Sequence, residues 1–352
     1  MESKEQTRRR LMEHSRQYPE LQIQDLFKYL HQSSFGCEHL VSSLETAIDG
    51  IRKETERETP LAPSPIVPLD GPYSRVPLSY GLSAETLGKL FFASAKEEKA
   101  RNRAFWEKLN VARELICERA LPVSLSEWEA EVCRWQAAGY PAVRHSEHFR
   151  TRYRPSYRVI ANCYLPFLPL FAALDQALQT GTVTLAIDGG SAGGKTTLSH
   201  RLEELYGCTV FHIDDFFLRP EQRTPRRLSE VGGNMDRERF LEEVLLPHRN
   251  GAPVTYRKFD CQTQALGDPV PIRSRKLTVI EGVYAMHPAL AEHYDLSVFL
   301  EIAPELQVRR ILHRNSAPMV KRFLEEWLPM EQAYFRTMQV KERCKLWISV
   351  SE

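Results

Sequence analysis

The chain has 352 residues, of which 42% are hydrophobic and 26% charged, and its 47 Lys and Arg nearly balance its 46 Asp and Glu. This composition excludes a mainly disordered chain, a collagen-like repeat and a small disulfide-stapled domain. At roughly 150 residues per domain, the length indicates two domains. Because the charges nearly cancel, attraction to nucleic acid or to anionic lipid would require a local patch.

The seven cysteines are scattered and form no CxxC pair, which argues against a zinc knuckle and a redox couple. The first ten residues are charged and lack the apolar core of a signal peptide. The most apolar stretch, residues 159–174, contains two prolines and is too short to span a bilayer. We therefore expect a reduced, cytoplasmic protein that does not associate with membranes.

The first half, residues 1–178, is predicted to be a mostly α-helical domain. Within it, residues 60–81 contain six prolines, which excludes a helix interior and indicates an extended connection. A later helix is marked by Ser124 with Glu127 three residues on, which is the spacing of a capping box. Gly139 is the predicted end of that helix.

The pattern changes near Thr180, where short β-rich apolar runs begin to alternate with helical segments. This alternation is typical of parallel βαβ units whose strands are buried on both faces. Residues 179–352 are therefore predicted to form an α/β domain with a doubly wound parallel sheet of about five strands. The predicted strands are Val183–Ile187, Thr209–Ile213, Leu277–Ile280 and Leu296–Ile302.

The strongest motif is the segment from Gly189 to Thr196, GGSAGGKT, which fits GxxxxGK[ST] between a predicted strand and an amphipathic helix. Its glycines let the backbone N–H groups point at phosphate oxygens, and the following helix adds a positive dipole end. We expect Lys195 to reach the β- and γ-phosphates and Thr196 to ligate magnesium. The predicted nucleotide-binding residues are Gly189, Gly190, Ser191, Ala192, Gly193, Gly194, Lys195, Thr196 and Thr197.

Two further strand ends bear on the reaction type. No Asn-Lys pair exists for guanine recognition, and the strand that ends at Glu281 has one carboxylate rather than the Asp-Glu pair of motor ATPases. Another strand ends in Asp214 and Asp215, and ligands of open α/β sheets lie beyond the carboxyl ends of the strands. A kinase needs such a carboxylate to accept the proton of the attacking hydroxyl.

With these motifs, the second half resembles the uridine kinase / phosphoribulokinase / pantothenate kinase superfamily of P-loop small-molecule kinases. The resemblance rests on the P-loop, the Asp-Asp-Phe-Phe strand end, the Val-Ile-Glu-Gly strand and the segment Leu-Gln-Val-Arg-Arg-Ile-Leu-His-Arg. It implies ATP and Mg²⁺ as cofactors, Asp215 as the hydroxyl-activating base with Asp214 beside it, and Glu281 near the magnesium. It also implies a lid over the phosphates that carries Arg309, Arg310 and Arg314.

The resemblance also suggests contacts for the phosphoryl acceptor. Asp236 matches an element that holds ribose hydroxyls in nucleoside kinases, and Tyr256, with Phe259 as the alternative, matches an aromatic placed against the acceptor. An insertion over 218–232 brings arginines, Arg219 among them, near the acceptor side. This insertion and the helical first half depart from ordinary uridine kinases, and chains of this arrangement resemble bacterial uridine kinase-like proteins.

The sequence thus predicts ATP-dependent phosphoryl transfer to an alcohol, most simply on a nucleoside or a related sugar-containing metabolite. The alternative is a nucleotide-dependent RNA-binding protein that uses the P-loop as a switch. The helical half carries a segment, residues 140–158, with five arginines and three tyrosines. We hypothesise that it helps to recognise the acceptor; the alternative is that its arginines pair with acids of the neighbouring domain.

Overall fold

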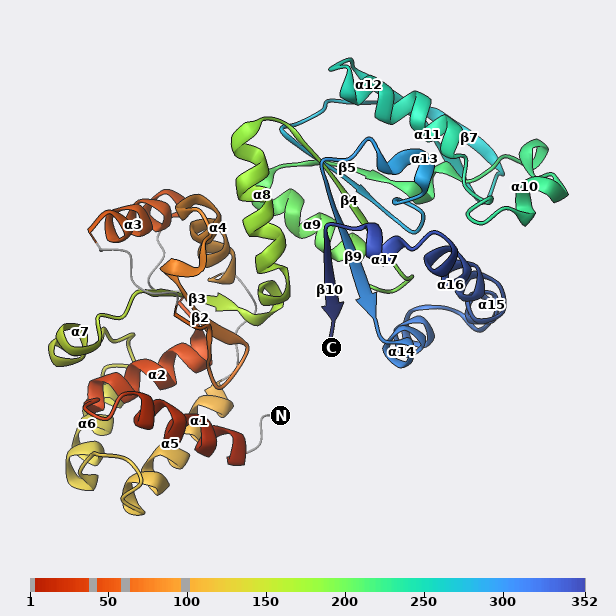
Figure 1. Ribbon diagram of the computed structural model, residues 1–352. Helices are drawn as coiled ribbons and strands as arrows, with labels where there is room; N and C mark the ends of the chain where they lie inside the picture. The colour runs from red at the N-terminus through yellow and green to blue at the C-terminus, as the bar shows by residue number, and fades with distance from the viewer. Residues whose placement is uncertain (1–3, 38–42, 58–63, 96–101, 352) are drawn as a thin grey trace. The chain divides into compact units, whose positions relative to one another are not determined.

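The computed structural model describes residues 4–37, 43–57, 64–95 and 102–351, and the chain divides into two compact units, residues 1–168 and 169–352 (Figure 1). The sequence placed the boundary after residue 178, inside helix α8 (Leu168–Thr180). Apart from its first residue, Leu168, this helix belongs to the second unit. Its buried Phe171 ring lies 6.4 Å from the ring of Tyr206 on α9.

The first unit is mostly helical, as predicted. Ser124 accepts a hydrogen bond of 3.3 Å from the Glu127 N–H and caps the sixth helix, which ends at Ala137 before the left-handed Gly139. The α-helices are α1 (Lys4–Gln17), α2 (Ile23–Phe35), α3 (Leu44–Arg57), α4 (Ala84–Ser94), α5 (Asn102–Cys117), α6 (Leu125–Ala137) and α7 (Glu147–Tyr153). Two 3₁₀ turns, η2 (Leu78–Tyr80) and η3 (Asn162–Phe167), follow strands.

A small antiparallel sheet completes this unit, in the order β1-β2-β3. Its strands are β1 (Val67–Pro68), β2 (Tyr73–Pro77) and β3 (Tyr157–Ala161). The extended backbone expected for the proline-rich stretch is therefore present from residue 64 onward, but the strand pairing was not predicted. Prolines at strand ends are compatible with the ladder because they leave the interior N–H groups intact. Residues 60–63 of that stretch lie outside the described residues.

The second unit contains the predicted parallel sheet. Five strands lie in the order β10-β9-β4-β8-β5, and every pairing in this sheet is parallel. The strands are β4 (Val183–Gly189), β5 (Thr209–His212), β8 (Leu277–Glu281), β9 (Leu296–Ile302) and β10 (Leu346–Val350). All residues of β4 and β8 are buried, which explains their uninterrupted apolar runs.

Helices and a hairpin surround this sheet. The helices are α9 (Lys195–Tyr206), α10 (Pro225–Ser229), α11 (Arg237–Phe240), α12 (Leu246–Arg249), α13 (Pro288–Ala291), α14 (Pro304–Arg314), α15 (Ala317–Arg322), α16 (Leu328–Thr337) and α17 (Val340–Arg343). Short 3₁₀ turns are η4 (Ile213–Phe216) and η5 (Pro220–Gln222), and π-helical turns are η6 (Leu241–Leu245) and η7 (Phe323–Trp327). Strands β6 (Val254–Asp260) and β7 (Ala265–Ile272) pair as an antiparallel hairpin.

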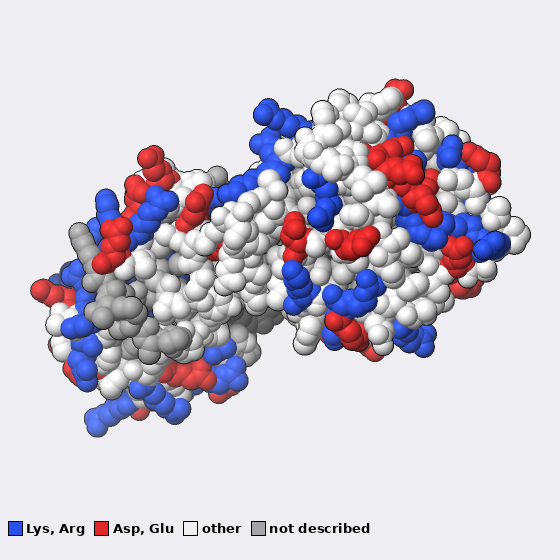
Figure 2. Space-filling model, turned by 45° about the horizontal axis from the view of Figure 1, so that its top comes forward, with Lys and Arg blue, Asp and Glu red and all other residues white. Residues whose placement is uncertain are grey.

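The surface charge follows the balanced composition. On the face shown in Figure 2, Lys and Arg are interspersed with Asp and Glu. Within the described part of the chain, no helix has the length and apolar character needed to cross a membrane.

Candidate active site in the second unit

The P-loop begins where β4 ends at Gly189 and leads directly into α9 at Lys195. Gly189 has φ +145°, and a Cβ there would lie 2.3 Å from the Leu300 carbonyl oxygen, so this turn requires glycine. The Lys195 ammonium is buried and donates to the carbonyl oxygens of Gly189 and Gly190, at 2.9 and 3.1 Å. The first turn of α9 leaves backbone N–H groups without helical partners. The loop therefore combines a fixed cation with open amide donors.

The sheet order brings three predicted site segments to one edge. Strands β4, β8 and β5 are parallel, and β8 lies between the other two, so their carboxyl ends meet. Glu281 at the end of β8 pairs in register with Ile187 of β4 and with His212 of β5. The P-loop, Glu281 and the Asp214–Asp215 pair thus share this edge, as the sequence predicted from the positions of the strand ends.

Glu281 is the centre of a short hydrogen-bonded chain. Its Oε1 accepts the Thr196 hydroxyl at 3.1 Å and lies 2.6 Å from His212 Nδ1. Burial opposes the ionisation of Glu281, but the hydrogen bonds from His212 and Thr196 and the charge of Lys195 outweigh it and lower its pKa. The same hydrogen bond raises the pKa of His212. An ionised carboxylate therefore lies beside the P-loop threonine.

The two aspartates after β5 differ in their surroundings. Asp214 is accessible to solvent although protein atoms surround it, and this partial desolvation raises its pKa, with Glu281 and Asp215 adding to the effect and Lys195 opposing it. Among the described residues, the contacts of the Asp215 carboxylate all involve its Oδ2 oxygen. Its Oδ2 accepts the Tyr256 hydroxyl at 2.9 Å and lies 3.0 Å from Lys258 Nζ. Among the described residues, no donor contacts its Oδ1, which leaves this oxygen open to a hydroxyl proton.

Tyr256 and Asp236, the residues predicted to contact the acceptor, are both buried but have different partners. Tyr256 is 3% exposed, and its ring stacks on Phe216 at 5.1 Å, so its contact is with Asp215. Asp236 is 2% exposed, caps α11 through the Arg239 N–H, and accepts a hydrogen bond from Gln222. Both carboxylate oxygens of Asp236 therefore have protein partners, and its contact with the acceptor stays a prediction.

The arginines predicted near the acceptor and the phosphates also have local partners. Arg219 donates to Gln222 and lies 3.3 Å from Glu221. In α14, Arg310 donates to the carbonyl oxygens of Ala192 and Ser351, at 3.2 and 2.9 Å, and therefore contacts the P-loop backbone. Arg314 lies over the Phe323 ring, and Arg309 is exposed on the same helix.

Several residues of this site were missed in the sequence. Glu331 of α16 accepts the Ser191 N–H at 3.0 Å and its hydroxyl, and Gln307 of α14 donates to the Ser191 carbonyl at 2.9 Å. Burial raises the pKa of Glu331, against these hydrogen bonds and the charge of Lys195. These side chains fix the outer turn of the P-loop. No local signal reveals them, because they lie more than a hundred positions from Ser191.

A second buried acid lies directly before the P-loop. Asp188 accepts hydrogen bonds from the N–H groups of Gly189 and Met286 and from the Tyr334 hydroxyl, at 2.7 to 2.8 Å. Burial raises its pKa to about 6, although these donors and Lys195 oppose the rise. The network ties β4 to α16.

Comparison with known families matches residues 184–320 to the model described as the Phosphoribulokinase / Uridine kinase family. The second half of the chain is a P-loop kinase domain of this family. The family binds a nucleotide and acts on small molecules, which agrees with the P-loop and with the carboxylates at its edge. Residues 1–183 lie outside the match. No match was found among curated proteins.

The chain is also similar to solved structures, each over about half of its length. A structure described as a possible uridine kinase from Bacillus stearothermophilus is 20% identical, with 51% of this chain and 100% of that chain covered and a TM-score of 0.38. A putative fructose transport system kinase from Silicibacter sp. TM1040 is 20% identical, with coverages of 47% and 89% and a TM-score of 0.40. A shikimate kinase from Acinetobacter baumannii is 18% identical, with coverages of 50% and 88% and a TM-score of 0.29.

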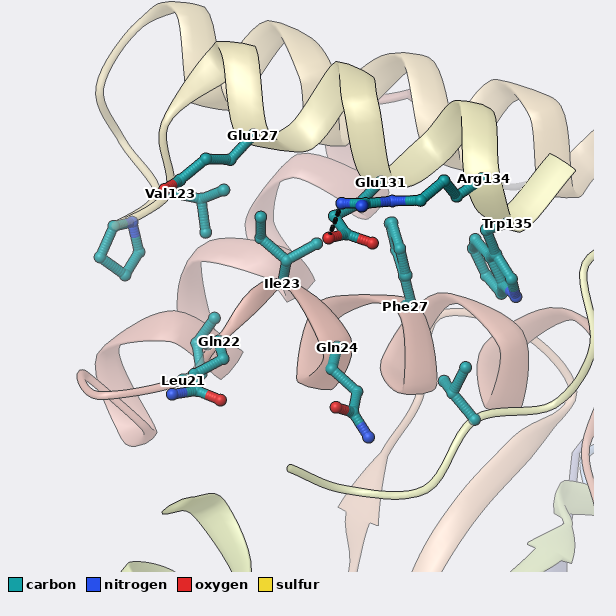
Figure 3. Close-up of a pocket in the computed structure, with 12 residues that line it drawn as sticks. Leu21, Gln22, Ile23, Gln24, Phe27, Val123, Glu127, Glu131, Arg134 and Trp135 are labelled. Atoms are coloured by element: carbon teal, nitrogen blue, oxygen red, sulfur yellow. Dashed lines mark hydrogen bonds and ion pairs between the residues drawn. The ribbon is translucent and has the colours of Figure 1, made fainter. Parts of the chain in front are cut away.

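The first unit contains a cavity of about 710 Å³ between α2 and α6. Figure 3 shows Ile23 and Phe27 of α2 beside Glu131 and Trp135 of α6, and the Phe27 and Trp135 rings stack at 4.3 Å. The cavity is lined by both apolar and polar side chains, and none of the predicted site residues lines it.

The arginines of segment 140–158 have partners inside the first unit. Arg152 pairs with Glu20 and Arg158 with Glu54, at 2.9 and 2.8 Å. These two arginines therefore pair with acids of their own unit, whereas the alternative expected them to pair with acids of the neighbouring domain.

Proposed function

We propose that the protein transfers the γ-phosphoryl group of ATP to a hydroxyl of a small metabolite, a nucleoside or a related sugar-containing compound. The observation that carries this proposal is the state of Asp215. Two donors hold its Oδ2, so the carboxylate is oriented, while Oδ1 has no donor among the described residues. A base with one held and one open oxygen suits the acceptance of a proton from an attacking hydroxyl.

The P-loop supplies the other half of the reaction. Lys195 and the loop amides would bind the phosphates and offset the negative charge that builds up on the transferring group. Among the described residues, the Lys195 ammonium has hydrogen bonds to carbonyl oxygens alone, which it could exchange for phosphate oxygens.

Magnesium fits the oxygen atoms at this edge. Thr196 Oγ1 and Glu281 Oε1 lie 3.1 Å apart, and hydroxyl and carboxylate oxygens are suitable ligands for Mg²⁺. When bound, the ion would be held by Thr196 and Glu281 and would neutralise part of the charge of the phosphates. Among the described residues, no group of three or more His, Cys, Asp or Glu could hold a metal ion, which suits a cation that shares its ligands with substrate phosphates.

The identity of the acceptor would be determined by screening. A panel of nucleosides, sugars and polyols tested for acceptor-stimulated ADP release would identify it. The expected result is stimulation by at least one compound, with turnover reduced about 10²- to 10⁴-fold in Asp215→Asn and little change in the KM for ATP. Turnover that survives in Asp215→Asn would remove this residue from the proton transfer.

A further inference from the structure

The first unit contains a buried guanidinium that no acid neutralises. Arg75 on β2 is 2% exposed, and its Nε and Nη2 both donate to Gln32 Oε1, at 3.1 and 2.8 Å. The Tyr157 ring lies 4.6 Å from its Cζ. Its Nη1 has no hydrogen-bond partner, and no carboxylate of the described residues lies within salt-bridge distance. Burial of a charge with only neutral partners is costly, so such a group calls for an explanation.

Two buried acids of the first unit, Asp25 and Asp70, do not pair with this arginine. Asp25 accepts hydrogen bonds from the Ser146 N–H and hydroxyl and lies 3.0 Å from His145 Nδ1. It also accepts the N–H of Gln22. Asp70, which is fully buried, lies 3.9 Å from Lys108, and neither of its carboxylate oxygens has a hydrogen-bond partner. Neither carboxylate lies within salt-bridge distance of the guanidinium.

A second cation lies close enough to repel the first. Lys28 on α2 is partly buried, donates to the Val143 carbonyl oxygen at 3.3 Å, and has no acid within salt-bridge distance among the described residues. Burial and then the charge of Arg75 lower its pKa to about 8, while the charge of Asp25 opposes this shift. Two partly desolvated cations that repel each other are costly unless an anion compensates them.

Unpartnered donors gather at the same place. His14 of α1 is 3% exposed and stacks on Tyr29 at 4.4 Å, and neither of its ring nitrogens has a partner. Burial lowers its pKa well below the usual value, with the charge of Arg75 adding to the effect. Arg75 Nη1 itself is buried, but the side chains of Tyr18, Lys28 and Tyr157 are partly exposed.

We propose that Arg75 and Lys28 form a binding site for the anionic group, a phosphate or a carboxylate, of a small molecule. The free Nη1 of Arg75 and the Lys28 ammonium would donate to its oxygens as charge-assisted hydrogen bonds, with the Tyr157 ring as one wall. The site is independent of the P-loop, so it goes beyond the proposed kinase reaction. It gives the helical unit a ligand of its own.

The reactivity of Lys28 provides a local measurement. An amine with a pKa near 8 is about half uncharged at pH 8, and a bound anion that raises the pKa by one unit would slow its acetylation about fivefold. The full-length protein would be treated with limiting acetic anhydride in chloride, inorganic phosphate or acetate at constant ionic strength. Acetylation of Lys28 would be compared with that of the exposed Lys53 by peptide mass spectrometry.

The expected result is a several-fold protection of Lys28 by phosphate, by acetate or by both, relative to chloride. Protection by phosphate alone would assign a phosphorylated ligand, and protection by acetate alone a carboxylate. The reporter is a single lysine of the first unit, so the measurement follows this site and not the occupancy of the P-loop. Equal labelling of Lys28 in all three salts would overturn the proposal.

Two arginine variants separate a binding role from a structural one. Arg75→Met should abolish the protection and leave the melting temperature in chloride unchanged or higher, because it removes an unneutralised buried charge. Arg158→Met is the matched control, since this arginine is neutralised by Glu54, and it should retain the protection. Protection that persists in Arg75→Met would overturn the assignment of Arg75. If Arg75→Met does not fold, the wild-type comparison of the three salts still decides.

Discussion

Replacement of Tyr256 by Phe removes one hydroxyl from the predicted catalytic base and changes little else. The hydroxyl donates to Asp215 Oδ2 at 2.9 Å, while the ring is buried and stacks on Phe216. A hydrogen bond to a charged group contributes about 1.5–3 kcal/mol. Since each 1.36 kcal/mol corresponds to a factor of ten, turnover should fall about 10- to 100-fold. Lys258 remains on the same oxygen, so the loss should be smaller than in Asp215→Asn.

The assay is steady-state ADP formation with the acceptor found by screening. The KM for ATP should change less than about twofold, because Tyr256 has no contact with the P-loop, and the melting temperature should stay within a few degrees because the ring keeps its packing. Tyr80→Phe, which removes the hydroxyl of a partly buried tyrosine of the first unit outside segment 140–158, is the control and should keep full turnover. Wild-type turnover in Tyr256→Phe, together with inactive Asp214→Asn, would refute the assignment of Asp215 as the base.

Four further outcomes are expected. Lys195→Ala should abolish transfer while the circular dichroism spectrum stays native, since the ammonium donates to the carbonyl oxygens of the loop glycines Gly189 and Gly190; near-wild-type turnover would contradict its role. Glu281→Gln should raise the Mg²⁺ concentration needed for half-maximal activity, and an unchanged magnesium titration would exclude it as a ligand. Burial raises the pKa of Asp188 to about 6, so the native state holds this proton more tightly than the unfolded chain does. Stability should therefore fall by about 3 kcal/mol as pH rises from about 4 through 6, and melting curves of Asp188→Asn should lack this fall. Arg150→Ala combined with Arg152→Ala should raise the KM for the acceptor and leave that for ATP; equal loss of both with a lower melting temperature would indicate a structural role.

The parallel sheet could be predicted because its strands carry a strong local signal. Strands β4 and β8 are buried on both faces, so their sequences are continuous apolar runs that stand out between helical segments. Strand β10 was not predicted. It lies at the edge of the sheet, where Trp347 is exposed, and its pattern is therefore mixed. The small sheet of the first unit was hidden by prolines, which occupy strand ends.

The core of the site could be anticipated because motifs at strand ends converge when the strands are parallel. The P-loop, Glu281 and Asp215 meet for this reason. Lys258 could have been found, because it lies two positions from Tyr256 on one strand and both side chains reach Asp215. Glu331 could not be found, because its contact with Ser191 depends on the packing of α16 and not on local sequence.

The surroundings of residues chosen by resemblance alone could not be predicted from the sequence. Asp236 was selected for its match to a ribose-binding element, and the structure buries it as a helix cap. Resemblance gives the position in the chain but not the rotamer or the exposure of the side chain. The role of the arginines in α14 likewise depends on contacts made only in the folded chain, such as that of Arg310 with Ala192.

The most direct test of the kinase assignment follows the fate of the γ-phosphate. With γ-labelled ATP, Mg²⁺ and a metabolite panel, the label should pass to a small alcohol in a one-to-one ratio with ADP, and this transfer should be lost in Asp215→Asn. The account would be contradicted if the protein bound RNA in an ATP-dependent way and formed no labelled small-molecule product with any acceptor. That result would favour a nucleotide-dependent RNA-binding protein.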